Sequence, residues 1–125
     1  MLEKGLKHTS RTVILPDNFA LAMGSGGLPV LATPALGALM ENAAMLAVAA
    51  ELPEGATTVG VKMDMTHVRP SGGGEEVYAE ATLVEVEGRK LTFSLVARDS
   101  VDVIGEGTHI RYIVDRTKFL SKLKG

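Results

Sequence analysis

The sequence has no cysteine and no tryptophan, and it holds only two tyrosines and three phenylalanines among its 125 residues. Without cysteine, disulfides and thiolate-bound zinc are excluded. With aromatic residues at 4%, the core has to be built from Val, Leu, Ala and Met. The hydrophobic fraction of 46% and the charged fraction of 22% are typical of a globular protein. The length predicts one domain, residues 1–125.

Charge and targeting signals are also scarce. The net charge of −2 leaves no basic field for nucleic acid, and no polybasic run suggests an anionic membrane surface. The first eight residues carry Glu3, Lys4 and Lys7 and lack the apolar centre of a secretory signal. The longest apolar stretch, residues 34–50, is 17 residues long and rich in alanine, which is short for a membrane span. We expect a cytoplasmic protein without nucleic-acid or membrane partners.

The chain alternates between predicted strands and one long predicted helix. Thr33 is a good N-cap and Pro34 suits the first helical position, so a helix is predicted to run from there to about Ala50. Pro53 and Gly55 end it. A glycine-rich loop, residues 16–29, is predicted to be irregular, and it is either a functional lid or a mobile connector. Strands are predicted over residues 8–15, 57–68, 76–86, 90–99 and 104–114, and a short basic helical turn over residues 115–125.

The order of elements predicts an α+β hotdog fold, in which one antiparallel β-sheet wraps around one long central helix. The helix is apolar nearly all round, as a buried helix must be, and the later strands alternate as antiparallel sheets do. One domain of this kind covers only part of its helix, so we expect a second subunit to complete the burial. Parity predicts two inner faces: Val59, Val61, Met63 and Met65 on one strand, and Ile110, Tyr112 and Val114 on another.

Glu41 is the most informative single residue, because it is the only charged group between positions 34 and 50. Its neighbours three and four positions away are Gly and Ala residues and Met45, so a buried carboxylate is predicted. Such a group costs several kcal/mol unless it is paired or protonated. A functional site explains this position, and so does a helix end near the surface or a structural carboxylate satisfied by Asn42 or by backbone groups.

His67 and Thr33 are the other candidates. By parity His67 continues the face of Met63 and Met65, where an imidazole can act as general base or acid; a strand-end histidine with one hydrogen bond is the alternative. Thr33 is explained as an N-cap, but a hydroxyl at a helix N-terminus also sits in a field that favours developing negative charge. His8 and His109 are predicted to face water, the latter beside Arg111, and no metal site is predicted.

The combination of these residues resembles the fluoroacetyl-CoA thioesterase-like family of hotdog proteins. The resemblance rests on Thr33 followed by Pro34, Glu41 within residues 39–44, and His67 after Thr66, with spacings of eight and 26 residues. Two further segments look alike, residues 86–91 and 104–109, and the resemblance covers roughly residues 30–114.

The resemblance implies a homodimer, with a tetramer as the alternative, whose active sites lie at the subunit interface. It implies hydrolysis of a small acyl-CoA to the free acid and CoA, with no cofactor other than the CoA of the substrate. Thr33 would be the nucleophile or a water-positioning group, Glu41 the carboxylate partner, and His67 the general base and acid. Gly60 matches a family glycine whose N–H lies near the thioester carbonyl. Covalent and direct-water routes both stay open.

One segment departs from the family. The fluoroacetyl-specific enzyme carries phenylalanines in its lid, whereas residues 19–32 here contain only Phe19, with Leu21, Met23 and Leu28. The sequence therefore does not predict fluoroacetyl selectivity. Two other functions compete with the thioesterase. A non-catalytic acyl-CoA-binding hotdog module needs no base. A hotdog hydratase also needs a histidine and a carboxylate or amide, normally in another order.

Overall fold

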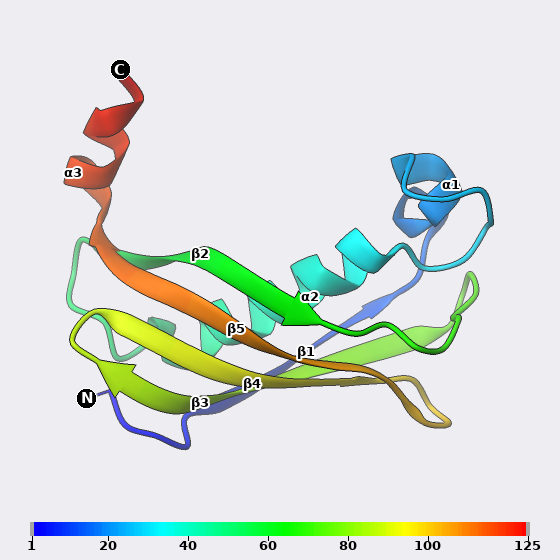
Figure 1. Ribbon diagram of the computed structural model, residues 1–125, viewed down its shortest axis with the longest axis horizontal. Helices are drawn as coiled ribbons and strands as arrows, with labels where there is room; N and C mark the ends of the chain where they lie inside the picture. Colours follow the sequence, from blue (N-terminus) through cyan, green and yellow to red (C-terminus); the bar gives the residue numbers. More distant parts are fainter. Residues whose placement is uncertain (1, 125) are drawn as a thin grey trace.

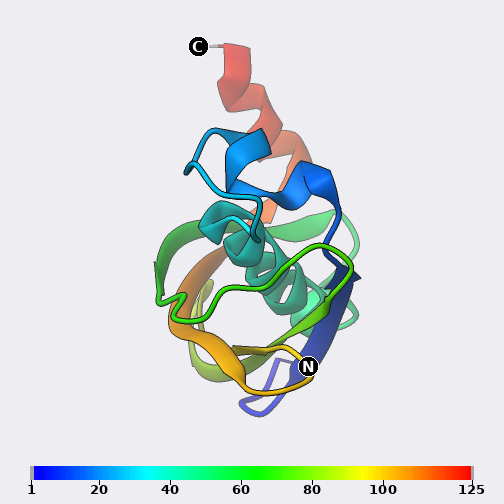
Figure 2. The same ribbon diagram turned by 90° about the vertical axis from the view of Figure 1, so that its right-hand side faces the viewer.

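A computed structural model describes residues 2–124. Five strands form one antiparallel sheet in the order β1-β3-β4-β5-β2, and one long helix, α2 (Thr33–Ala49), lies against its inner face. The strands are β1 (Lys7–Val13), β2 (Ala56–Met65), β3 (Glu76–Glu87), β4 (Lys90–Arg98) and β5 (Val103–Asp115). Seen end-on, the sheet curls around α2 (Figure 2). This arrangement confirms the predicted α+β hotdog fold.

The smaller elements lie at the two ends of the molecule (Figure 1). Between β1 and α2 the chain forms a 3-10 turn, η1 (Pro16–Asn18), and a short helix, α1 (Ala20–Met23). The prediction of a wholly irregular segment there was wrong, because two local turns form before the glycines begin. After β5 come α3 (Arg116–Ser121) and the 3-10 turn η2 (Lys122–Lys124), which confirm the predicted helical tail.

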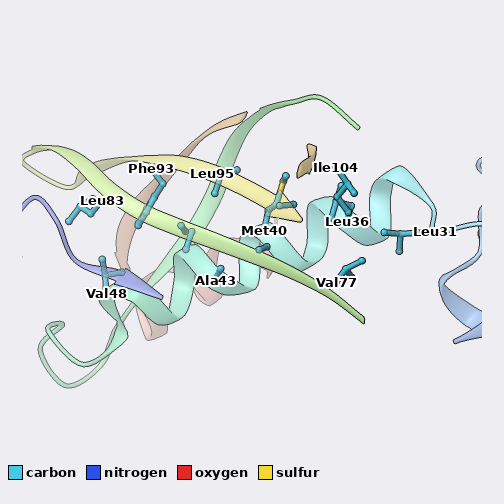
Figure 3. Close-up of a cluster of buried hydrophobic side chains, with 14 of the residues drawn as sticks. Leu31, Leu36, Met40, Ala43, Val48, Val77, Leu83, Phe93, Leu95 and Ile104 are labelled. Carbon is cyan, nitrogen blue, oxygen red and sulfur yellow. The ribbon is translucent and has the colours of Figure 1, made fainter. Parts of the chain in front are cut away.

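The core lies between one face of α2 and the inner face of the sheet (Figure 3). On the helix the buried side chains recur at helical spacing, as in Leu36, Met40, Ala43 and Val48. The sheet contributes Val77, Ala79, Ala81, Leu83, Leu91, Phe93, Leu95 and Ala97, with Ile104 at the start of β5. Among residues 2–124, Phe93 is the one fully buried phenylalanine of this core, and small residues on β3 let the helix approach the sheet closely.

The opposite face of α2 is open in the single chain, in line with the expectation that one domain covers only part of its helix. Ala38, Glu41, Asn42 and Leu46 are exposed in the single chain. The apolar composition of the helix did not reveal which face is buried and which is open, because alanine fits both equally well. The strand β2 is likewise at an edge of the sheet, and its Val61 is 55% exposed.

A β-bulge in β2 changes which residues face the helix. The register of β2 with β5 shifts between Gly60 and Lys62. Cross-strand partners share a face, so Thr58 and Gly60 point inward before the bulge, and Met63 and Met65 after it. The predicted single face with Val59 and Val61 was wrong, since alternation fails at a bulge.

The inner face of β5 was also predicted wrongly. Phe93 pairs with His109 and Leu91 pairs with Arg111, which puts both polar residues on the core side of the sheet. His109 is 1% exposed and Arg111 is 6% exposed, whereas Tyr112 is 38% exposed. His8 is half-buried rather than in open water, on the face that carries buried Ser10. Ser10 donates to Asn42 on α2 (2.6 Å), so this face of β1 points to the helix.

Candidate active site

The first half of the site lies at the beginning of α2. Thr33 is the first helical residue, and Ala32, not Thr33, is the N-cap; no side-chain capping bond forms. The predicted capping role was therefore wrong. The hydroxyl Oγ1 of Thr33 lies instead 2.9 Å from Nδ1 of His67, two residues beyond the end of β2. The antiparallel return of β2 along α2 brings together these two residues, which are 34 positions apart in the chain.

His67 is poised to accept a proton. Partial burial lowers the pKa of its imidazole below the usual value, and the backbone of Arg69 offsets this only in part. The ring is therefore neutral at pH 7 and can serve as a base. Its Nε2 is buried and has no hydrogen-bond partner within residues 2–124. In the tautomer that protonates Nε2, the Thr33 hydroxyl donates to Nδ1.

A lid, defined here as residues 16–32, lies beside this first half. Its two ends are joined by the N–H of Ala20 donating to Val30 O (2.8 Å) and by the N–H of Ala32 donating to Asn18 O (2.8 Å). The N–H of Leu31 donates to Ser71 O (2.9 Å), which fixes the lid to the loop that follows His67. Three apolar side chains of the lid are exposed, namely Leu21, Met23 and Leu28.

The second half of the site surrounds Gly60 in the middle of β2. A Cβ at Gly60 would lie 2.7 Å from Oε2 of Glu41 and 3.1 Å from Cε1 of His109. Glycine thus allows the close approach of the Glu41 and His109 side chains, and a larger residue would have to displace the Glu41 carboxylate. A pocket of about 420 Å³ opens at this point. Its lining is Ala38, Glu41, Asn42, Met45, Thr58, Val59, Gly60 and Arg111.

Arg111 lies on the inner side of this pocket and is held by three contacts. Its Nε donates to Thr58 Oγ1 (2.8 Å), its Nη2 donates to Thr58 O (2.9 Å), and its Nη1 lies 3.1 Å from His109 Nε2. Burial lowers the pKa of the guanidinium, and the negative charge of Glu41 partly restores it. Arginine nevertheless stays charged, so the pocket has a fixed cation in its wall.

His109 completes the cluster from the same strand. Its Nδ1 lies 2.8 Å from Lys62 O, and its Nε2 faces Arg111. Since a guanidinium can only donate, Nε2 has to accept, and Nδ1 carries the proton that is donated to Lys62 O. Burial lowers the pKa of His109 most, and the charge of Arg111 lowers it further. Thr58, His109 and Arg111 were missed from the sequence, and the signal that could have found them is a glycine within an alternating strand, which suggests a bulge.

Within one chain the two halves lie apart. Thr33 and Glu41 are eight residues apart on α2, which corresponds to about 12 Å along the helix axis. The structure brings Thr33 to His67 and Glu41 to Gly60. The carboxylate, predicted to be buried, is exposed at the pocket, because the open face of α2 carries it.

Other regions offer less chemistry. A depression of about 500 Å³ lies over Thr9, Tyr78, Glu80, Val96 and Arg98, but it contains no histidine. Within residues 2–124, no group of three or more His, Asp or Glu side chains is arranged to hold a metal ion. In the same part of the chain, no helix has the length and apolar character needed to cross a membrane.

Several solved structures share this architecture. The fluoroacetyl-CoA thioesterase FlK superposes with a TM-score of 0.93 at 32% identity, covering 99% of this chain and 96% of that chain. A variant of that enzyme solved in complex with acetyl-CoA gives a TM-score of 0.93 at 30% identity, covering 98% and 97%. A thioesterase superfamily member from Thermus thermophilus shares the fold, with a TM-score of 0.90 at 23% identity, covering 98% and 90%. Fold and sequence together make the chain a thioesterase of the hotdog class.

The family can be stated more narrowly. The family model described as "Fluoroacetyl-CoA-specific thioesterase" matches residues 14–117. The fluoroacetyl-CoA thioesterase of Streptantibioticus cattleyicolor is 38% identical over 95 residues, which cover 76% of this chain and 68% of that protein. The chain belongs to the fluoroacetyl-CoA-specific thioesterase family. The resemblance inferred from the sequence is thereby confirmed, and with it the prediction of a thioester hydrolase.

Proposed function

We propose that this chain hydrolyses a small acyl-CoA to the free acid and CoA, with Thr33, Glu41 and His67 as its catalytic residues. The observation that carries the proposal is the contact of 2.9 Å between Thr33 Oγ1 and His67 Nδ1, made by an imidazole with a lowered pKa. A thioester needs a nucleophile, a base for its proton and a donor for the oxyanion, but no strong acid for the thiolate.

In the reaction, His67 removes a proton from the Thr33 hydroxyl or from a water beside it. The oxygen attacks the thioester carbonyl, and the N–H of Gly60 stabilises the oxyanion. Collapse of the tetrahedral species expels the CoA thiolate, which takes up the proton that His67 had removed. The Thr33 route adds an ester intermediate that water then cleaves; the direct route needs no such intermediate.

We further propose a homodimer with two composite sites. β2 is an edge strand with an exposed Val61, and the open face of α2 lies next to it. Antiparallel pairing of two β2 strands would reverse one chain relative to the other. It would bring the partner's His67 toward Gly60 and Glu41 of the first chain, so that two separated halves become one site.

Complementation between two inactive variants tests this arrangement. His67→Ala and Glu41→Gln are each expected to abolish turnover alone. Mixed after reversible unfolding, they form heterodimers in which one of two sites is intact, so about a quarter of the wild-type activity should return. No return of activity would place the whole site within one subunit.

The substrate is tested with a panel of CoA esters, from acetyl to phenylacetyl, in a thiol-release assay. We expect turnover of a small apolar acyl group without selectivity for fluoroacetyl, because the lid supplies only one phenylalanine, Phe19. Saturable binding of CoA esters without turnover would instead indicate a binding module. We propose a cytoplasmic location, since the phosphates of an acyl-CoA keep it in the compartment where it is made.

A further inference from the structure

Two side chains of β5 hold the bulge of β2 from both sides. Arg111 donates twice to Thr58, which precedes Gly60, and His109 is bonded to the carbonyl of Lys62, which follows it. The contact between His109 Nε2 and Arg111 Nη1 joins the two supports. We call these residues, Thr58, His109 and Arg111, the bulge clamp.

We infer that His109 is a positioning residue for the thioesterase reaction, which holds Gly60 and Arg111 in place through its neutral imidazole. The inference rests on the proposed function. His109 itself is 1% exposed and does not line the pocket, so it acts through its neighbours. Without it, the Lys62 carbonyl and one guanidinium N–H would both lose a buried partner, and the backbone at Gly60 could shift.

The surroundings of His109 require the neutral form. Arg111 on β5 and Glu41 on α2 are the charged groups that act on it, the Phe93 ring on β4 lies 6.3 Å away between centroids, and β2 contributes the Lys62 carbonyl. Protonation of Nε2 would turn two donors toward each other across 3.1 Å and place two cations side by side. The neutral ring instead donates on one side and accepts on the other.

The kinetic test compares three variants with the wild type on its best CoA ester. Because a misplaced group costs about 10²-fold in rate, His109→Ala should lower kcat by about 10–100-fold and change KM by less than about threefold. His109→Gln can accept from Arg111 through its amide oxygen, and should recover most of the loss. His8→Gln, a matched change on the inner face of β1, should leave kcat unchanged.

Two further readouts separate positioning from stability. In the wild type, protonation of His109 contributes to the acid limb of kcat; in His109→Gln that contribution is absent, so the limb becomes less steep. Nitrogen NMR should show that the His109 imidazole, recognised by the signals that are lost in His109→Gln, is protonated at Nδ1 only. That measurement does not depend on turnover.

Each outcome decides a separate question. An active wild type with kcat unchanged in folded His109→Ala overturns the positioning role alone, as does a His109 imidazole protonated at Nε2. A wild type that hydrolyses no CoA ester overturns the proposed function and this role with it. A loss in His109→Ala that His109→Gln restores supports the role.

Discussion

His67 and His109 lie on the same side of the sheet but are held in different ways. The Nδ1 of His67 meets the Thr33 hydroxyl, and its Nε2 is buried without a hydrogen bond in the described part of the chain. Both nitrogens of His109 are engaged, one by Lys62 and one by Arg111. Burial is the largest cause of the lowered pKa in both. Similar pKa directions therefore accompany the two different tasks proposed for these rings: a base has to change its protonation state, whereas a positioning group has to keep it.

The largest expected effect is at the less constrained histidine. His67→Ala removes the proposed base, and general base catalysis is worth about 10²–10⁴-fold, so kcat should fall by about 10³-fold or more. Thiol release measures it, and circular dichroism checks the fold. Activity within tenfold of wild type would show that His67 is not the base and would remove the contrast with His109.

Thr33 is expected to show the next largest effect. Thr33→Val keeps the shape but removes the hydroxyl, and should lower kcat by about 10²-fold, whereas Thr33→Ser keeps the hydroxyl and should stay within about fivefold. Mass spectrometry of the reacting enzyme shows an added acyl group only if Thr33 attacks directly. Turnover by Thr33→Val within about tenfold of the wild type would indicate the direct-water route.

A substitution at Gly60 tests the second half of the site, which the bulge clamp holds. A methyl group there would displace Glu41, whose carboxylate is the movable end of a flexible side chain, while His109 and Arg111 are fixed. We expect Gly60→Ala to lower kcat/KM about tenfold, at a stability cost of about 1 kcal/mol. Gly27→Ala is the matched control for stability, because nothing lies within 4 Å of its Cβ position. A Gly60→Ala enzyme with the kcat/KM of the wild type would contradict the close approach at Gly60.

The smallest expected effect is on the pH dependence of the melting temperature. A histidine whose pKa is lowered by folding favours the folded state above its unfolded pKa of about 6.5, and this contribution is lost as the pH falls through the lower folded value. Tm should therefore fall between pH 7 and pH 5. Thermal scans of His67→Gln and His109→Gln should each show a smaller fall than wild type. An unchanged pH dependence in His109→Gln would show that this ring does not titrate in the fold.

The sequence predicted the elements better than it predicted their faces. The strands and α2 were found within a few residues because alternation and the Pro and Gly stops are local signals. Arg111 and His109 were placed in water because Ile110 and Tyr112 looked like the core side of β5. The pairing with Leu91 and Phe93 determines which side of β5 faces the core, and this pairing between two strands cannot be read from the pattern within β5 alone. In the same way, the sequence showed that Glu41 is unusual. It did not show that Glu41 on α2 lies beside Gly60, because Gly60 belongs to another element, β2.

Two glycines of β5 restrict what this strand can become. A Cβ at Gly105 would lie 2.3 Å from Thr66 O, and one at Gly107 would lie 2.4 Å from Asp64 O, so neither position accepts a side chain without separating β5 from β2. The strand that carries His109 and Arg111 therefore does not tolerate side chains at positions 105 and 107. The lid, residues 16–32, is largely exposed and fixed mainly through its ends. New acyl preferences would therefore be acquired by exchanging the lid, in evolution or in the laboratory, while the reacting groups stay as they are.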